Sequence, residues 1–227
     1  MPSTLFSARA TLFALLLLAA CVPVPAERVE VTQVAQKPTY YPHGTGTLWR
    51  YLPEGEAEDA QALVQLVEGP TILEGERLTA WRTTGRGLET RSFRDYREDG
   101  VYLVRETGPG YVTTLSPGVR EWPRAGTLRL GSSWGGSAAA TITFTDAGRE
   151  QVLRLEYTYT VVDRRTVETT AGSFEVFVIA FESTSFGESG QVQDTLRQEI
   201  WFEPFVGEVR TENNMYLVET NLPLPTP

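Results

Sequence analysis

The sequence predicts an all-β protein: a strongly curved antiparallel sheet, or half-open barrel, built from hairpins with few or short helices. Apolar and polar residues alternate with a period of two over many short segments, as they do in half-buried strands. Glycine-containing turns separate these segments at hairpin spacing. Hydrophobic residues make up 41% of the 227 residues, enough for a sizeable core. One β-rich domain is therefore predicted over residues 43–221.

The first 20 residues are predicted to be an export signal. An apolar run that ends at Leu18 follows Arg9, and two alanines come next, which are the three parts that a secretory signal requires. The run is far shorter than the roughly 20 apolar residues that span a bilayer. The alternatives are a signal with an incidental cysteine after it, or an uncleaved buried segment.

The end of this run, Leu18-Ala19-Ala20-Cys21, resembles the lipobox of bacterial lipoproteins. The resemblance implies cleavage between Ala20 and Cys21 and acylation of Cys21, with chains such as palmitate tying the protein to a membrane. Cys21 is the only cysteine, which fits this role because exported proteins usually carry cysteines in pairs for disulfides. Val22 follows in place of an aspartate, which favours the outer membrane over the inner where a cell has both.

A tether and a tail are predicted at the two ends of the mature chain. Residues 21–42 contain several prolines and no sustained period, which predicts an extended spacer. Residues 222–227 place a proline at every second position, which predicts a polyproline-like tail. Plain disorder is the alternative for both segments.

The first half of the domain is predicted to be a meander of hairpins. Residues 48–52 and 78–82 alternate in polarity, and residues 101–104 form a central strand. Residues 56–67 permit a helix or a strand, and the apolar alternation of residues 62, 64 and 66 favours the strand. Turns are expected at residues 85–87, 98–100 and 108–110.

The second half carries the clearest strands. Over residues 152–163, one face is apolar and the other carries charged residues and threonines, which predicts one buried and one wet face. Residues 174–181 are apolar on both faces, which predicts a strand that is covered on each side. Residues 199–205 and 207–218 are expected to form a last pair. The apolar face of the first strand is made of Leu153, Leu155, Tyr157, Tyr159 and Val161.

Two segments, residues 169–176 and 201–209, resemble the paired signature of a broad bacterial envelope family of uncharacterised domains. That signature is an Ala-Gly-x-Phe hairpin, followed by an aromatic strand that leads to Pro-x-Val-Gly-x-Val. Related families adopt a curved sheet like that of the lipoprotein-localisation carriers, whose concave face holds acyl chains. The resemblance implies such a sheet and assigns no catalytic residue. Phe205 stands where the family often has glycine.

Two upstream segments, residues 41–49 and 130–134, resemble the Gly-x-x-Trp entry strands of the same family. The spacing from glycine to tryptophan is equal in the two, from Gly46 to Trp49 and from Gly131 to Trp134. The equal spacing favours two related halves that meet near residues 120–130, although the signal is short for a repeat.

The residues that most catalytic and metal sites need are missing. Residues 131–135 match a nucleophile elbow around Ser133, but a strand is expected after it and the only histidine, His43, lies upstream. One histidine and one lipid-modified cysteine exclude zinc and transition-metal sites with nitrogen and sulfur ligands. The formal net charge of −9 argues against nucleic acid. We therefore predict no catalytic residue, cofactor or metal.

Aromatic side chains are the remaining candidates for a binding site. They can line a ligand groove or pack in the core, and core packing is favoured. The arginines of residues 77–97 are interleaved with acidic residues, which predicts ion pairs on the wet face. The acidic residues at 54–59 are expected to lie in a solvated loop. The aromatic candidates are Trp49, Trp81, Trp134, Tyr157, Tyr159, Phe177, Phe181 and Trp201, and Trp122 is the fifth tryptophan.

Two functions remain open. The preferred one is a non-enzymatic, lipid-anchored lipoprotein of the cell envelope, facing the periplasm or the exterior, that binds a lipid, another apolar ligand or an envelope protein, or serves as a scaffold. The alternative is a periplasmic hydrolase that cleaves cell-wall polymer with two carboxylates. A groove lined by apolar side chains would support a lipid carrier, and two facing carboxylates would support the hydrolase.

Overall fold

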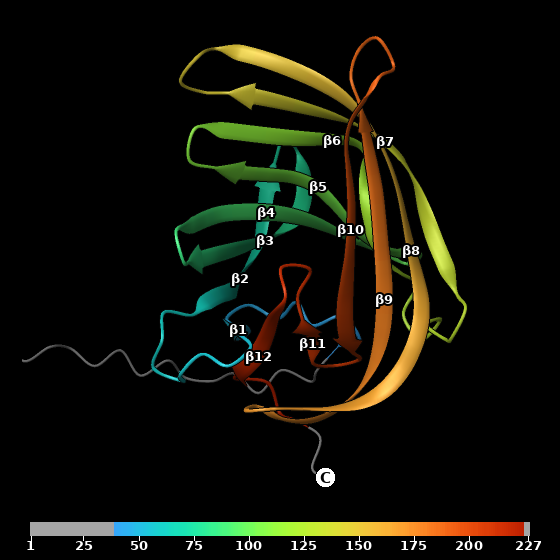
Figure 1. Ribbon diagram of the computed structural model, residues 1–227. Helices are drawn as coiled ribbons and strands as arrows, with labels where there is room; N and C mark the ends of the chain where they lie inside the picture. Colours follow the sequence, from blue (N-terminus) through green and yellow to red (C-terminus); the bar gives the residue numbers. More distant parts are fainter. Residues whose placement is uncertain (1–38, 225–227) are drawn as a thin grey trace, which may run out of the picture. The chain divides into compact units, whose positions relative to one another are not determined.

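The computed structural model describes residues 39–224, which form an antiparallel β-barrel of twelve strands (Figure 1). The all-β prediction is confirmed, but the barrel is closed where a half-open one was an option. Closure arises because β1 pairs with both β2 and β12, which leaves no free sheet edge. No helix within residues 39–224 is long and apolar enough to cross a membrane. The strands are β1 (Leu48–Pro53), β2 (Leu63–Leu73), β3 (Glu76–Gly85), β4 (Leu88–Arg97), β5 (Gly100–Gly108), β6 (Tyr111–Pro123), β7 (Ser133–Phe144), β8 (Arg149–Thr169), β9 (Gly172–Phe186), β10 (Val192–Glu203), β11 (Gly207–Arg210) and β12 (Met215–Thr220).

The predicted signal, the lipobox with Ala20 and Cys21, and the tether as far as residue 38 lie outside the described residues, as do residues 225–227. Tyr40 and Tyr41 stand at the end of the predicted tether, yet both pack against the core of the barrel. The tether therefore ends before Tyr40 and not at residue 42. Leu222 and Leu224, from the predicted tail, also pack against the barrel.

Residues 56–67, which permitted a helix or a strand, form turns followed by the start of strand β2. Residues 56–62 contain turns, and the strand starts at Leu63. Leu63 pairs with Tyr51 and Gln65 pairs with Trp49, so these four side chains share one face of the sheet. Gln65 consequently faces the barrel interior, where it lines a pocket.

Strand β8 has the buried and wet faces that the sequence predicts. Tyr157, Tyr159 and Val161 are buried, and the residues that alternate with them are exposed or half-buried. A β-bulge at Val162 then shifts the register before Asp163. The bulge adds a residue to this strand, so the side chains beyond it no longer follow the same alternation.

Strand β9 is covered on both faces, as its apolar sequence predicts. Ile179 and Phe181 pack in a core cluster with residues of β7 and β8. Phe174, Val176 and Val178 pack in a second cluster with residues of β1, β11 and β12. The β8–β9 hairpin therefore joins the two clusters of the barrel.

The turn from β10 to β11 holds a residue in a strained conformation. Phe205 has a φ of 69°, in the left-handed region that glycine adopts at low cost. This is the position at which the resembling family often has glycine. Gly207, two residues later, has a φ of 106°, and a Cβ at this position would lie 3.2 Å from Nε1 of Trp49. The turn thus brings the backbone of β11 close to Trp49.

The two segments with equal Gly-to-Trp spacing adopt similar local structures. Gly46 and Gly131 both have positive φ, 83° and 80°. Trp49 and Trp134 then enter β1 and β7 and are both buried. Each segment is a glycine turn that leads into a strand with an inward-facing tryptophan.

Candidate ligand-binding site

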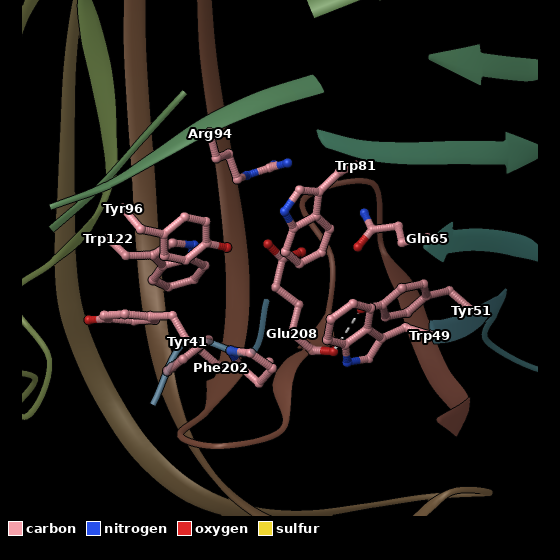
Figure 2. Close-up of a pocket in the computed structure, with 12 residues that line it drawn as sticks. Tyr41, Trp49, Tyr51, Gln65, Trp81, Arg94, Tyr96, Trp122, Phe202 and Glu208 are labelled. Carbon is pink, nitrogen blue, oxygen red and sulfur yellow. Dashed lines mark hydrogen bonds between the residues drawn. The ribbon is translucent and has the colours of Figure 1, made fainter. Parts of the chain in front are cut away.

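A pocket opens among side chains from β1–β4, β6, β10 and β11, strands that are far apart in the sequence (Figure 2). It has a volume of about 50 Å³. A cavity of about 150 Å³ is needed for benzene and about 15 Å³ for one water, so this pocket has room for a few waters or one small group. An acyl chain does not fit. Its aromatic walls are Tyr41, Trp49, Tyr51, Trp81, Tyr96, Trp122 and Phe202.

Hydrogen bonds fix the aromatic side chains of β1. The Trp49 indole donates from Nε1 to the backbone oxygen of Val206 over 2.7 Å, and the Tyr51 hydroxyl donates to the backbone oxygen of Glu208 over 3.1 Å. Trp49 also stacks on Trp81, with ring centroids 5.1 Å apart and an angle of 9° between the planes. These contacts bind β1 to β11 and give the pocket a rigid wall.

An ion pair crosses the interior beside the aromatic wall. The Arg94 guanidinium donates to both oxygens of Glu121 over 2.6 and 3.2 Å, and donates to Oγ of Ser92 over 2.6 Å. It also lies 4.8 Å from the centre of the Trp81 ring. Burial lowers the pKa of Arg94, but attraction to Glu121 outweighs it and holds the pKa above its ordinary value. Arg94 was expected in an ion pair on the wet face; the pair forms, but inside the barrel.

Glu208 presents a carboxylate to the pocket, and its side chain rises from β11 (Figure 2). Within residues 39–224 this carboxylate makes no hydrogen bond or ion pair. Burial raises the pKa of Glu208 to about 8, and repulsion by Glu212 and Glu121 adds to the rise, while Arg94 opposes it. The pKa of Glu212, an exposed residue on the loop after β11, is also raised, by desolvation and by repulsion from Glu121 and Glu106.

Two further polar groups of the pocket lack partners within the described chain. The Tyr41 hydroxyl is buried and makes no hydrogen bond, and the buried Trp81 Nε1–H makes no well-aligned one, although the Tyr96 hydroxyl lies close enough to interact with it. Gln65 lines the pocket beside them. A buried donor without a partner costs about 1–3 kcal/mol. Water or a ligand in the pocket would recover part of this cost for Trp81.

The predicted aromatic candidates divide between the pocket and the core. Trp49 and Trp81 line the pocket, as does Trp122. Trp201 packs near the second core cluster, between the guanidinium groups of Arg165 and Arg210, and donates to Glu199. The remaining candidates pack in or against the first core cluster: Trp134, Tyr157, Tyr159, Phe177 and Phe181.

The nucleophile elbow is absent at Ser133. The residue begins strand β7, and its Oγ donates to the backbone oxygen of Tyr159 over 2.9 Å. His43 lies elsewhere, with its ring 4.1 Å from that of Tyr96. The neighbouring Trp134 is buried and stacks on Tyr159, 5.3 Å away. The glycine-bracketed segment therefore turns Trp134 into the core.

The charged surface groups also lie where the sequence predicts. Residues 54–59 form an exposed turn. Arg82 and Arg91 both pair with Glu68, and Arg86 pairs with Glu56. Among the described residues, no group of three or more His, Cys, Asp or Glu side chains is placed to hold a metal ion.

Comparison with models of protein families and with curated proteins finds no match to this chain. Two solved structures are similar: a candidate exported protein of Bacteroides fragilis with a YmcC-like fold, at 13% identity and a TM-score of 0.42, and a candidate lipoprotein of Parabacteroides distasonis, at 14% and 0.44. Each match covers 82% of this chain and 100% of the other. Because these identities and scores are low, the function is argued from the residues of this chain.

Proposed function

We propose that the protein is a lipid-anchored lipoprotein of the cell envelope, and that its barrel is a non-enzymatic module that binds a small polar ligand. The lipobox resemblance at residues 18–21 supports the anchor. The interior pocket supports the binding role, because aromatic walls there surround a carboxylate, Glu208, that has no partner in the described chain. This pocket is the observation that carries the proposal.

The size and lining of the pocket favour a small polar ligand over a lipid tail. A volume of about 50 Å³ is a third of what benzene requires, and an acyl chain needs a longer apolar channel. Arg94, Gln65 and Glu208 also line the pocket, and their polar groups would lose water without gaining partners if an acyl chain entered. A ligand with hydrogen-bonding groups avoids this cost.

A carboxylate-dependent hydrolase remains the second candidate, because the raised pKa of Glu208 suits a general acid. Glu121 is held by Arg94, so the second carboxylate would be Glu212. Incubation of the purified protein with cell-wall polymer tests this. Products that disappear with both Glu208→Gln and Glu212→Gln would favour the hydrolase, and absence of products would favour the binding module.

The anchor is tested by labelling cells with radioactive palmitate. We expect the wild-type protein to be labelled and the Cys21→Ser variant to remain unlabelled at equal expression. Equal labelling of the two would refute acylation at Cys21.

The binding role is tested by NMR on the Cys21→Ser chain, which lacks the acyl chains. The indole N–H signal of Trp81 is the reporter, and the probes are small amines, neutral sugars and glycols, and a fatty acid. A saturable shift with any small polar probe supports the module. No shift with every such probe contradicts it.

A further inference from the structure

We propose that the pocket binds the ammonium group of a small primary amine, which pairs with the Glu208 carboxylate. This inference rests on the proposed binding function and names the ligand class of the same site. The ammonium group would enter the pocket, and the rest of the molecule would extend toward solvent. A free amine and the amine headgroup of a lipid share this chemistry.

The acidic residues that line and border the pocket outnumber the cations among them. Glu121, Glu208 and Glu212 act on one another electrostatically, and Arg94 is the cation that the described residues place among them. Arg94 already donates two hydrogen bonds to Glu121. Glu208 therefore needs a proton, or a cation that residues 39–224 do not supply, because a carboxylate that loses water without gaining a partner is costly.

The aromatic walls of the pocket suit an organic ammonium group. Aromatic rings surround the carboxylate, and rings attract organic ammonium groups through their electron-rich faces. The described residues do not supply the set of three or more ligands that a metal ion would take. The Trp81 Nε1–H, buried at the pocket beside the Tyr96 hydroxyl and without a well-aligned partner, can donate to an oxygen on the same ligand. An amino alcohol has both groups.

Pairing with an ammonium group depends on the protonation state of Glu208. Because burial holds the pKa of Glu208 at about 8, free Glu208 is protonated at pH 6 and must lose its proton to pair with an ammonium group. Affinity should therefore rise about tenfold for each pH unit up to about 8 and then level off.

Several other groups face Glu208 from the surrounding elements. Arg94, Tyr96, Tyr51 and Tyr159 all have pKa values above this range, because attraction to Glu121 outweighs burial for Arg94 and burial raises the three tyrosines. Glu121 is held in its ion pair with Arg94. The pKa of Glu212 is raised as well, so the Glu212→Gln variant is needed to show that the pH dependence of binding comes from Glu208.

The test compares ethanolamine with ethylene glycol, which has a similar size and no charge. Both are titrated into the Cys21→Ser chain, with the Trp81 indole signal as the reporter. We expect saturable binding of ethanolamine, no binding of ethylene glycol, and about 50-fold weaker ethanolamine binding at pH 6 than at pH 8, because Glu208 is half ionised at its pKa of about 8. Glu208→Gln should abolish binding. Glu98→Gln, in the exposed turn before β5, is the matched control and should retain it.

Vesicles separate the two sources of the amine. Binding to phosphatidylethanolamine vesicles, but not to phosphatidylcholine vesicles or free ethanolamine, would support a lipid headgroup as the source. Equal binding of ethanolamine and ethylene glycol, or full binding by Glu208→Gln, would overturn the inference and leave the binding module in place. Failure of every small polar probe and of both kinds of vesicle would overturn the inference and contradict the module as well.

Discussion

Replacing Arg94 with methionine removes the cation that holds Glu121 inside the barrel. The two side chains are 19% and 18% exposed, so water screens the pair only in part. Methionine replaces the apolar stem of arginine and lacks the guanidinium group. Breaking a buried ion pair by removing one partner costs about 3–5 kcal/mol, because the other charge is left unpaired. With this residual exposure, we expect a loss of about 3 kcal/mol at pH 7.

The same variant has a diagnostic dependence on pH. In the variant, a carboxylate left without its cation can take up a proton instead, which removes the unpaired charge, so the loss should shrink as the pH falls from 7 to 5. Urea unfolding followed by circular dichroism measures the free energy of unfolding at both values. Arg77→Met is the control, because Arg77 is exposed on the adjacent strand, and it should cost less than about 0.5 kcal/mol. Equal losses in the two variants, or a loss that grows at pH 5, would refute the electrostatic reasoning.

Three further substitutions test the aromatic wall and the turn beneath it, each by urea unfolding at pH 7. Trp49→Phe removes the hydrogen bond to Val206 and part of the stacking on Trp81, and should cost about 1–3 kcal/mol; no loss would contradict the role of that contact. Phe205→Gly should stabilise the protein by about 1 kcal/mol by relieving the positive φ, and a net loss would mean that packing on Tyr40 outweighs the strain. Gly207→Ala should cost about 1–3 kcal/mol, because its Cβ would press on Trp49; unchanged stability would show that the turn yields.

The strands could be predicted from the sequence, because successive side chains of a strand point to opposite faces of the sheet, so alternate residues are buried together. Tyr157 and Tyr159 are two residues apart and are both buried. Closure could not be predicted in the same way. Closure requires pairing of β1 with β12, which are each six residues long and lie near opposite ends of the domain in the sequence. Nothing local in either short segment indicates its partner.

The charged part of the pocket could not be predicted for a related reason. Arg94 stands among arginines that form exposed ion pairs, and a bulge between Phe93 and Arg94 interrupts the pairing of β4 with β5. A bulge adds a residue to one strand and breaks the alternation of inward and outward side chains. The alternation of the neighbouring residues therefore does not predict whether Arg94 faces inward. One feature of the sequence points to Glu208: it is a charged residue between Val206 and Val209, in a segment expected to be a strand.

A pH titration followed by carbon-13 NMR measures the pKa of the Glu208 side-chain carboxyl directly. Glu208→Gln identifies the signal. We expect an apparent pKa of about 8, because the pocket desolvates the carboxylate and gives it no partner. The folded state then binds the proton more tightly than the unfolded state, so Glu208 favours folding at acid pH and loses this contribution as the pH rises through 8. A pKa near the ordinary glutamate value of about 4.5 would mean that water or a counter-ion already satisfies the group, and would contradict a ligand site organised around an unpaired carboxylate.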